Sequence, residues 1–166
     1  MKFLNIGLLL ISLTGCSTAY QANSLTGGFS ETQLDTNLFK VTFQGNGFTK
    51  PEAVEEMALL RSAELTLKHG FTHFVVVNTQ SRNNVAAVTT PTQSYTTANA
   101  TAFGNTAYGS SQTTTYGGQT FLIATPSASN TILCFKGKPD TQALAYDASF
   151  ICSSLGQKYG ASCGQK

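Results

Sequence analysis

The sequence predicts an α/β (α+β) fold, a single small domain in which two helices pack on a four-stranded mixed sheet. Three observations predict it: residues 39–44 alternate apolar and polar side chains, residues 49–69 form an amphipathic helical pattern, and residues 71–78 form a continuous apolar run. The expected order is β-α-β, a long loop, then β-β-α. The 166-residue chain is long enough for one domain with its own core, which we place at residues 28–158.

Residues 39–44 are expected to form a half-buried strand. Phe39, Val41 and Phe43 alternate with polar side chains, so they fall on one face of an extended chain. Glycine and asparagine at residues 45–47 favour a turn that ends the strand. The apolar face should therefore contribute directly to the core.

A helix is expected over residues 49–69. Thr49 and Glu52 have the Thr-x-x-Glu spacing of a capping box, and Pro51 suits the first turn. Gly70 is typical of the residue just beyond a helix C-terminus. The expected apolar stripe consists of Ala53, Met57, Leu60, Ala63 and Leu67, widened by Val54, Ala58 and Leu65. This stripe should bury against the sheet.

Residues 71–78 follow the helix without a break and are rich in β-branched and aromatic side chains. A continuous apolar run of this length predicts an interior strand that is covered on both faces. A strand, a helix and a strand joined by short connections predict a right-handed crossover. The strands at 39–44 and 71–78 should then run parallel.

The composition changes abruptly after this strand. Residues 83–135 contain no charged side chain, and residues 83–118 are mostly Thr, Ser, Asn, Gln, Gly, Ala and Tyr. We interpret residues 83–118 as a low-complexity, mobile loop with partial hairpin character. The alternative is a long β-hairpin in which residues 85–89 and 113–116 pair as stems.

This uncharged segment contains the candidate interaction residues Tyr95, Tyr108 and Tyr116. Tyrosines among Ser, Gly and Asn form adaptable contact surfaces in binding proteins. A solvated insertion without a partner is the alternative interpretation.

Two more strands are expected after the low-complexity segment. Residues 119–125 and 131–136 are apolar enough to be core strands, and residues 126–130 contain the turn formers Pro, Ser and Asn. Such a short connection predicts that the two strands pair in the antiparallel direction.

A second helix is predicted to begin with Asp140 as its N-cap and to run to about Leu155. Gly156 is expected to end it. Its apolar stripe consists of Leu144, Ala148, Ile151, Cys152 and Leu155. Residues 159–166 are interpreted as a C-terminal tail.

The N-terminus has the pattern of an export signal. Lys2 gives a positive start, and residues 3–13 form an apolar stretch that is too short to span a bilayer as a helix. The Leu-Thr-Gly-Cys sequence at 13–16 resembles the lipobox of bacterial lipoproteins. The resemblance implies a signal peptide at residues 1–15, diacylglycerol on the Cys16 thiol, and acylation (palmitate, for example) of the new amino group. The alternative is an ordinary secretory signal with a coincidental cysteine.

Lipidation at Cys16 has consequences for location. Three acyl chains would hold the chain stably on a membrane. Residues 16–27 are interpreted as the lipidated N-terminus and a polar tether. Ser17 follows the lipidated residue, and under the usual sorting rule for lipoproteins this residue type implies transfer to the outer membrane. We expect the domain to lie on the periplasmic face, which the sorting rule itself does not determine.

The mature chain would be almost neutral. Loss of Lys2 with the leader leaves 9 Lys and Arg residues against 8 Asp and Glu residues. A near-neutral domain lacks the basic surface with which proteins bind nucleic acids. We therefore expect no nucleic-acid partner.

Several segments together are similar to a family of small proteobacterial outer-membrane lipoproteins of unknown function. The similar segments are residues 28–35, 39–49 with Gly-Asn-Gly-Phe-Thr, 60–66 with Arg-x-Ala-Glu-Leu-Thr, and 70–74. Members share a lipobox, a Thr/Ser/Gly-rich middle and a Gly-Lys-x-Pro segment before the last helix, which is one residue shorter here, at 137–139. The resemblance implies a lipid-anchored single domain and brings no catalytic residues.

Three cysteines remain once Cys16 is lipidated. Export predicts an oxidising compartment, in which three thiols allow one disulfide and one free cysteine. We favour Cys152–Cys163, which would join the tail to the second helix. Cys134–Cys152 is the alternative, if that helix packs on the strand that contains Cys134.

The sequence offers few candidate catalytic or metal-binding groups. Arg61, Glu64 and Lys68 have the spacing of ion pairs on a helix surface. The other acidic and histidine candidates are Glu31, Asp35, His69 and His73. Glu31 and Asp35 fit a solvated side chain and a turn, and His73 fits a core or interface position.

Motifs that would identify an enzyme are missing from the chain. The two histidines have no cysteine at metal-ligand spacing, and neither a Gly-x-Ser-x-Gly nucleophile motif nor a Gly-x-x-x-x-Gly-Lys phosphate loop occurs. We therefore expect no catalytic residue, no cofactor and no metal.

The function expected from the sequence is a non-enzymatic structural or protein-interaction role in the cell envelope. The expected partners are membrane lipid, through acylated Cys16, and an envelope protein. A ligand-binding or envelope-stress-sensing lipoprotein is the alternative, and an enzyme ranks third.

Overall fold

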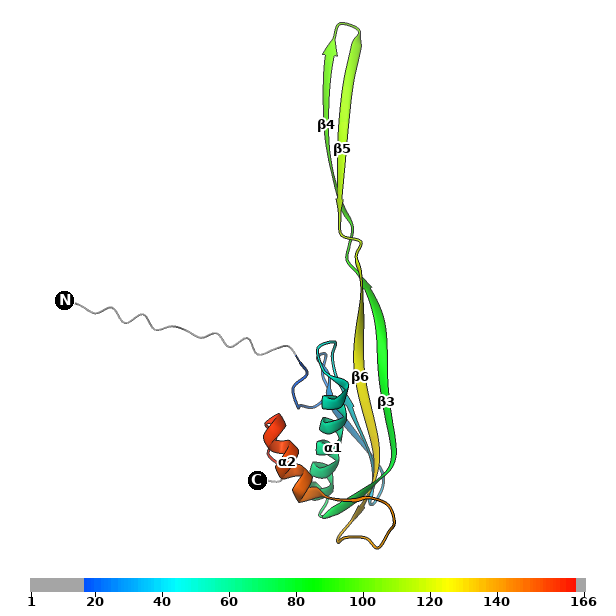
Figure 1. Ribbon diagram of the computed structural model, residues 1–166, viewed down its shortest axis with the longest axis vertical. Coiled ribbons are helices and arrows are strands. Elements are labelled where there is room, and N and C mark those ends of the chain that lie inside the picture. Colours follow the sequence, from blue (N-terminus) through cyan, green and yellow to red (C-terminus); the bar gives the residue numbers. More distant parts are fainter. Residues whose placement is uncertain (1–16, 164–166) are drawn as a thin grey trace, which may run out of the picture. The chain divides into compact units, whose positions relative to one another are not determined.

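The computed structural model describes residues 17–163, which form two compact units. The core domain consists of residues 17–84 and 125–163, and the hairpin consists of residues 85–124. The expected signal peptide and Cys16 lie outside the described residues. The fold is α+β, with most elements being strands and with two helices (Figure 1).

A five-stranded sheet organises the core domain. Its strands, in their order across the sheet, are β1 (Gly28–Asp35), β2 (Leu38–Gln44), β6 (Thr120–Phe135), β3 (His73–Thr89) and β7 (Ala145–Asp147). The pairs β1–β2, β2–β6 and β3–β7 are antiparallel.

Contacts between β3 and β6 show that these strands are antiparallel too. Thr72 N–H donates to the Phe135 carbonyl at 2.9 Å, and Thr79 Oγ1 donates to Asn130 Oδ1 at 2.9 Å, so the partner number falls as the β3 number rises. Because two antiparallel steps separate β2 from β3, these two strands point in the same direction, as the crossover predicts. They are not neighbours, however, since β6 lies between them.

Two helices, α1 (Pro51–Lys68) and α2 (Ala148–Tyr159), lie on the same face of this sheet (Figure 1). β2 places Phe39, Val41 and Phe43 under them, each at most 1% exposed. The alternation predicted for this strand is therefore confirmed.

The buried surface of α1 is wider than its predicted apolar stripe. Ser62 and Thr66 are both 0% exposed, because α1 packs between the sheet and α2. Their hydroxyls donate to carbonyls one turn earlier, Ser62 to Ala58 at 2.8 Å and Thr66 to Ser62 at 2.7 Å. Helix geometry thus supplies the partners that let polar side chains enter the core.

The ends of α1 differ in how well the sequence predicts them. Gly70 ends the helix with φ +76°, and the Phe71 N–H bonds the Thr66 carbonyl, as expected for a glycine C-terminus. The predicted capping box is wrong, because the N-cap is Lys50 without a side-chain hydrogen bond. The Thr49 hydroxyl instead contacts Thr18 and Asn46, so a tertiary contact takes the place of the local cap.

The prediction of a four-stranded mixed sheet is wrong in number and direction. The sheet has five strands, all neighbouring pairs are antiparallel, and β4 and β5 form a separate two-stranded sheet. β1 and β7 were not predicted. β1 is an edge strand with mostly exposed side chains, and β7 has only three residues, so neither carries an apolar alternation.

The prediction of two strands joined by a turn at residues 126–130 is wrong, because β6 is one strand. It runs continuously through Pro126, because the Pro126 carbonyl accepts from the Gly45 N–H at 2.8 Å. The N and carbonyl of one residue face the same side of a strand, so the proline nitrogen also faces β2. β2 ends at Gln44, so the missing N–H falls beyond the last residue of β2.

β3 is an interior strand, but it is not covered along both faces as predicted. Phe74 and Val75 are buried, whereas Val77 is 53% exposed and the strand continues to Thr89 with exposed side chains. Among residues 17–163, both helices lie on one face of the sheet, and no helix covers the other face where Val77 is exposed.

The second helix begins later than predicted. Asp147, not Asp140, is its N-cap, and its carboxylate accepts from the Phe150 N–H at 3.0 Å. Gly156 lies inside the helix and is buried, while Gly160 ends it with φ +67°. Leu144 of the predicted stripe precedes the helix and is exposed.

Residues 17–27, part of the segment predicted as the lipidated N-terminus and a polar tether, contact the rest of the core domain. Thr18 is 5% exposed, and Tyr20 packs on Phe29 and Phe43 with ring centroids 5.2 and 6.3 Å away. Backbone bridges at Ala22 and Ser24 add to these contacts. A short polar sequence thus contributes to the core domain through a few specific contacts.

Most of residues 83–118 lie in strands and not in the mobile loop that we favoured. β4 (Gln93–Phe103) pairs with β5 (Thr106–Tyr116), and Gly104 at φ +63° opens their two-residue connection. The alternative hairpin, in which residues 85–89 pair with residues 113–116, has the wrong register. Residues 113–116 pair with β4, and Thr89 lies opposite Thr120 of β6.

Candidate functional site

The β4–β5 register places the aromatic side chains of this pair on one face. Tyr95 lies opposite Thr114, Tyr108 opposite Thr101, and Tyr116 opposite Gln93. Opposed residues share a face and alternate residues of a strand return to it. The three predicted tyrosines are therefore brought to one side of the sheet.

Phe103 belongs to the same face and was missed by the sequence analysis. It lies opposite Thr106, at the two-residue connection that begins with Gly104. A Gly-Asn pair between two extended segments is a recognised hairpin signal, and it could have located this residue. Phe103 and the three tyrosines, which we call the aromatic face, are each at least 66% exposed.

The opposite side of β4 and β5, which we call the small-residue face, carries no side chain longer than threonine. It consists of Ser94, Thr96, Ala98, Ala100, Ala102, Ala107, Gly109, Ser111, Thr113 and Thr115. Cross-strand hydroxyl contacts at 2.8 Å (Thr96–Thr113) and 3.0 Å (Ser94–Thr115) lie on this face. The two faces therefore offer different chemistry to anything that binds them.

The hairpin has no buried core. Every residue of β4 and β5 is exposed, and Leu122 and Ile123 of β6 are 74% and 40% exposed. A two-stranded sheet without a covered apolar face is marginally stable in water. Backbone pairing and short side-chain contacts hold this region together.

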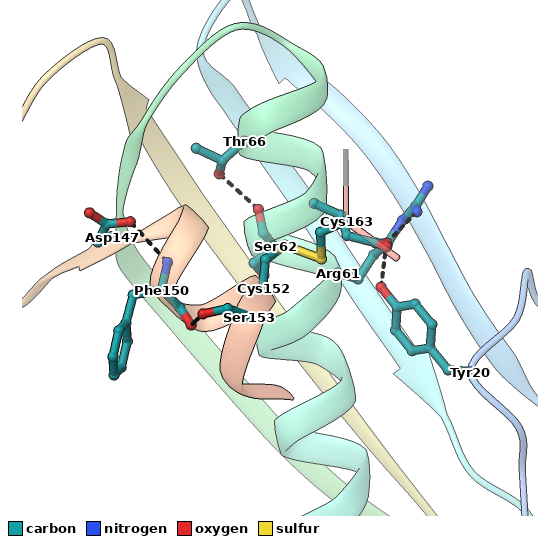
Figure 2. Close-up of a disulfide and its surroundings, with 10 residues drawn as sticks. Tyr20, Arg61, Ser62, Thr66, Asp147, Phe150, Cys152, Ser153 and Cys163 are labelled. Carbon is teal, nitrogen blue, oxygen red and sulfur yellow. Dashed lines mark hydrogen bonds and ion pairs between the residues drawn. A yellow bond between two sulfur atoms is a disulfide. The ribbon is translucent and has the colours of Figure 1, made fainter. Parts of the chain in front are cut away.

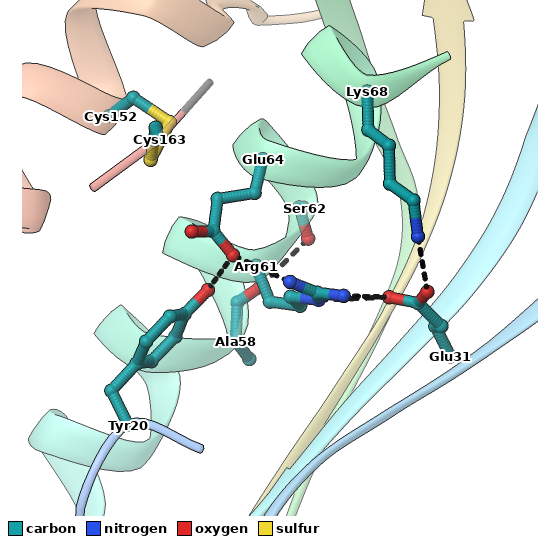
Figure 3. A network of polar contacts seen from close by, with 9 residues as sticks. All are labelled: Tyr20, Glu31, Ala58, Arg61, Ser62, Glu64, Lys68, Cys152 and Cys163. Carbon is teal, nitrogen blue, oxygen red and sulfur yellow. Dashed lines mark hydrogen bonds and ion pairs between the residues drawn. A yellow bond between two sulfur atoms is a disulfide. The ribbon is translucent and has the colours of Figure 1, made fainter. Parts of the chain in front are cut away.

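A polar network on α1 contains the candidate pair Arg61 and Glu64 (Figure 3). Arg61 Nη1 lies 2.7 Å from Glu64 Oε2, and Arg61 Nη2 lies 2.7 Å from Glu31 Oε2 of β1. The guanidinium also stacks over the Phe29 ring at 3.9 Å. These contacts join α1 to β1, so the pair is a tertiary link and not the isolated helix-surface pair that we expected.

Tyr20 completes this network from the N-terminal segment. Its hydroxyl donates to Glu64, while Lys68 pairs with Glu31 at 3.5 Å and not with Glu64 as its spacing suggested. Burial and the hydrogen bond to Glu64 raise the pKa of Tyr20 well above its usual range, so the hydroxyl stays a donor. The network suits a structural clamp on the N-terminal segment.

The other titratable candidates lie apart from one another. His73 Nε2 is 3.9 Å from Asp147 Oδ2, and the His69 ring packs at a tilt against Phe39, with ring centroids 4.6 Å apart. Asp35 accepts from the Thr36 N–H at 2.7 Å in the predicted turn. Among residues 17–163, no three His, Cys, Asp or Glu side chains gather as they would around a metal ion.

The cysteines follow the favoured pairing. Cys152 of α2 and Cys163 form a disulfide with a Cα separation of 5.6 Å, which joins the tail to the helix (Figure 2). Cys134 is a free, buried cysteine whose Sγ lies 3.4 Å from Thr66 Oγ1. Burial raises the pKa of its thiol, so it behaves as a small core residue.

Comparison of the chain with protein-family models, curated proteins and solved structures finds no match. Within residues 17–163, neither helix combines the length and the apolar character needed to cross a bilayer.

Proposed function

We propose that this chain is an outer-membrane lipoprotein, anchored through Cys16, with a non-enzymatic role in which the hairpin binds another envelope protein. The observation that carries the proposal is the hairpin: it is uncharged, its strands β4 and β5 are exposed throughout, and the aromatic side chains of β4–β5 lie on one face. The lipobox-like residues 13–16 and the resemblance to proteobacterial lipoproteins support the anchor.

The physical argument for a protein partner begins with stability. Two exposed strands gain little from folding alone, so a bound partner that covers one face would supply the missing apolar burial. Tyrosine suits this role because its ring buries apolar area while its hydroxyl keeps a polar contact. β4 and β5 each have an unpaired edge without Lys or Pro, which is the edge type that accepts an added strand.

The test combines crosslinking in cells with affinity purification and mass spectrometry. In one variant, Asn-Gly replaces residues 90–119, so that Thr89 and Thr120, whose hydroxyls lie 3.0 Å apart, flank a two-residue turn. A second variant carries Tyr95→Ser and Tyr108→Ser on the aromatic face. Its matched control carries Thr96→Ser and Thr113→Ser on the small-residue face.

We expect a stoichiometric envelope partner whose yield falls about ten-fold or more in the first two variants and is retained in the control. A partner captured equally by the shortened chain would overturn the role of the hairpin. Loss in the control alone would move the contact to the small-residue face. Mass spectrometry of the N-terminal peptide and membrane fractionation test the anchor separately, and recovery in the inner membrane or the soluble periplasm would overturn it.

A further inference from the structure

The chain is held by the core domain immediately after position 16. Thr18 N–H donates to Thr49 Oγ1 at 2.9 Å, and Thr18 Oγ1 donates to the Thr26 carbonyl at 2.8 Å. The Asn46 N–H donates to the same Thr18 hydroxyl at 2.9 Å. Thr18 is 5% exposed, so it is a buried junction between two loops.

This junction limits the distance between the domain and a lipid on Cys16. Only Ser17 separates Cys16 from Thr18. Consecutive Cα atoms are about 3.8 Å apart, so the two Cα atoms lie within about 8 Å of each other. An acylated Cys16 therefore keeps the core domain close to the bilayer, and the surface around Thr18 must lie at the membrane.

Two large apolar side chains project from the loops that Thr18 joins. Leu25 precedes Thr26 and is 108% exposed, and Phe48 precedes Thr49 and is 77% exposed. Each is thus one residue away from a direct partner of Thr18. Lys50 and Glu52 are the exposed charged residues nearest to Phe48 in the sequence, and their opposite signs give no basic patch for attracting anionic lipid.

We propose that Leu25 and Phe48 insert into the bilayer that holds the Cys16 lipid, and that they fix the orientation of the core domain on it. The inference rests on the proposed lipidation. Apolar side chains at the boundary between headgroups and acyl chains add burial to a lipid anchor. Because Lys50 and Glu52 offset each other, the contact is apolar and independent of salt.

The chain contains no tryptophan, so a substitution to tryptophan gives a unique fluorophore. The probes are Phe48→Trp and Leu25→Trp in the full-length lipidated protein, reconstituted in phosphatidylcholine vesicles with brominated acyl chains. The matched control is Phe150→Trp, which replaces an aromatic residue that is 69% exposed. Phe150 lies near the C-terminal end of α1, since the Ala148 N–H bonds the Thr72 carbonyl, whereas Phe48 precedes α1. A helix of 18 residues separates these ends by about 27 Å.

We expect the brominated lipid to quench positions 48 and 25 at least about two-fold more than position 150, because only the first two reach the acyl region. The difference should persist in about 0.5 M salt, where surface charges are screened. Equal quenching at positions 48 and 150, in protein that floats with the vesicles, would overturn this inference and leave the anchor intact. Protein that carries no acyl mass and does not float would overturn both the anchor and the inference.

Discussion

The core domain and the hairpin are both built largely from antiparallel strands, and they are stabilised in different ways. Strand β6 belongs to both, which makes the contrast direct. Ile132, near one end of β6, is 0% exposed under the helices, while Ile123, near the other end, is 40% exposed. The same residue type in the same strand therefore has a different role in each unit.

This contrast shows what converts a strand into a core strand. The backbone pairing is similar in both units, but only the core domain has helices that cover one face of its sheet. Burial of apolar area is the main source of folding free energy, and strand pairing alone supplies little of it. The hairpin therefore has an open apolar surface, which is why we propose the interaction role for it.

The sharpest test compares Ile132→Ala with Ile123→Ala. The first leaves a cavity in the core and should lower the free energy of unfolding by about 2–5 kcal/mol. The second removes a partly exposed side chain and should cost less than about 1 kcal/mol. Chemical denaturation followed by far-UV circular dichroism measures both. Equal losses would mean that the hairpin is buried in solution, and the comparison would fail.

The disulfide provides the next largest effect. The double variant Cys152→Ser and Cys163→Ser frees the tail from α2, and closure of an 11-residue separation predicts a loss of roughly 3 kcal/mol. Wild-type protein in reductant should show the same loss, and the double variant should not respond to reductant. Amide exchange in residues 93–116 should stay unchanged. Faster exchange there would show that the two units unfold together.

A smaller effect is expected at the clamp on the N-terminal segment. Tyr20→Phe removes the hydrogen bond to Glu64 and should cost about 1–2 kcal/mol, since bonds to charged groups are stronger than neutral ones. Tyr95→Phe in the hairpin is the matched control and should change stability by less than about 0.5 kcal/mol. Urea denaturation at neutral pH measures both variants.

The same pair has a pH signature. The pKa of Tyr20 is raised in the folded state, so its stabilising contribution is complete below the ordinary tyrosine pKa. It is lost as the pH rises above about 10. Wild-type protein should therefore lose stability relative to Tyr20→Phe on the alkaline side, and parallel alkaline profiles would contradict the assignment.

The smallest effect is expected where α1 meets α2. Glu56 accepts from Lys158 and Tyr159, and these hydrogen bonds lower its pKa below the ordinary 4.5. Its contribution is present above that value and is lost as the pH falls through the folded pKa. Melting temperatures of wild-type protein and Glu56→Gln should converge as the pH falls below about 4.5. A gap that stays constant with pH would exclude the carboxylate as the cause.

Burial and the bond to Glu56 raise the pKa of Tyr159 to about 12. The contribution of Tyr159 therefore persists below the ordinary tyrosine pKa and is lost toward pH 12. Glu56→Gln should therefore also reduce the loss of stability that Tyr159 causes at alkaline pH. This second effect distinguishes the Glu56 contact from the clamp at Tyr20.

Local patterns in the sequence were sufficient where short-range physics sets the structure. The alternation of Phe39, Val41 and Phe43 and the glycine end of α1 at Gly70 follow from chain-local geometry. The Cys152–Cys163 pairing was favoured from the sequence, but the packing of α2 decided it against Cys134–Cys152. The tyrosines of the candidate site were also found from composition. Their position on one face was not, because a face depends on the pairing register.

Only the tertiary structure decided which partner each segment meets. Thr49 has the spacing of a helix cap, but the N-terminal segment folds back and its hydroxyl bonds Thr18. Pro126 looks like a turn residue, but it lies where β2 has already ended, so β6 continues through it. β1 and β7 lack apolar alternation and become strands because a neighbouring strand supplies their hydrogen bonds.

The sequence by itself determined the apolar patterns and the turn residues, since these depend on neighbours within a few positions. The uncharged composition of residues 83–135 is likewise read directly from the sequence. The tertiary structure decided the order of the five strands, the single aromatic face of the hairpin and the burial of Thr18. These depend on contacts between segments far apart in the chain, whose energies compete with local preferences of about 1 kcal/mol and override them.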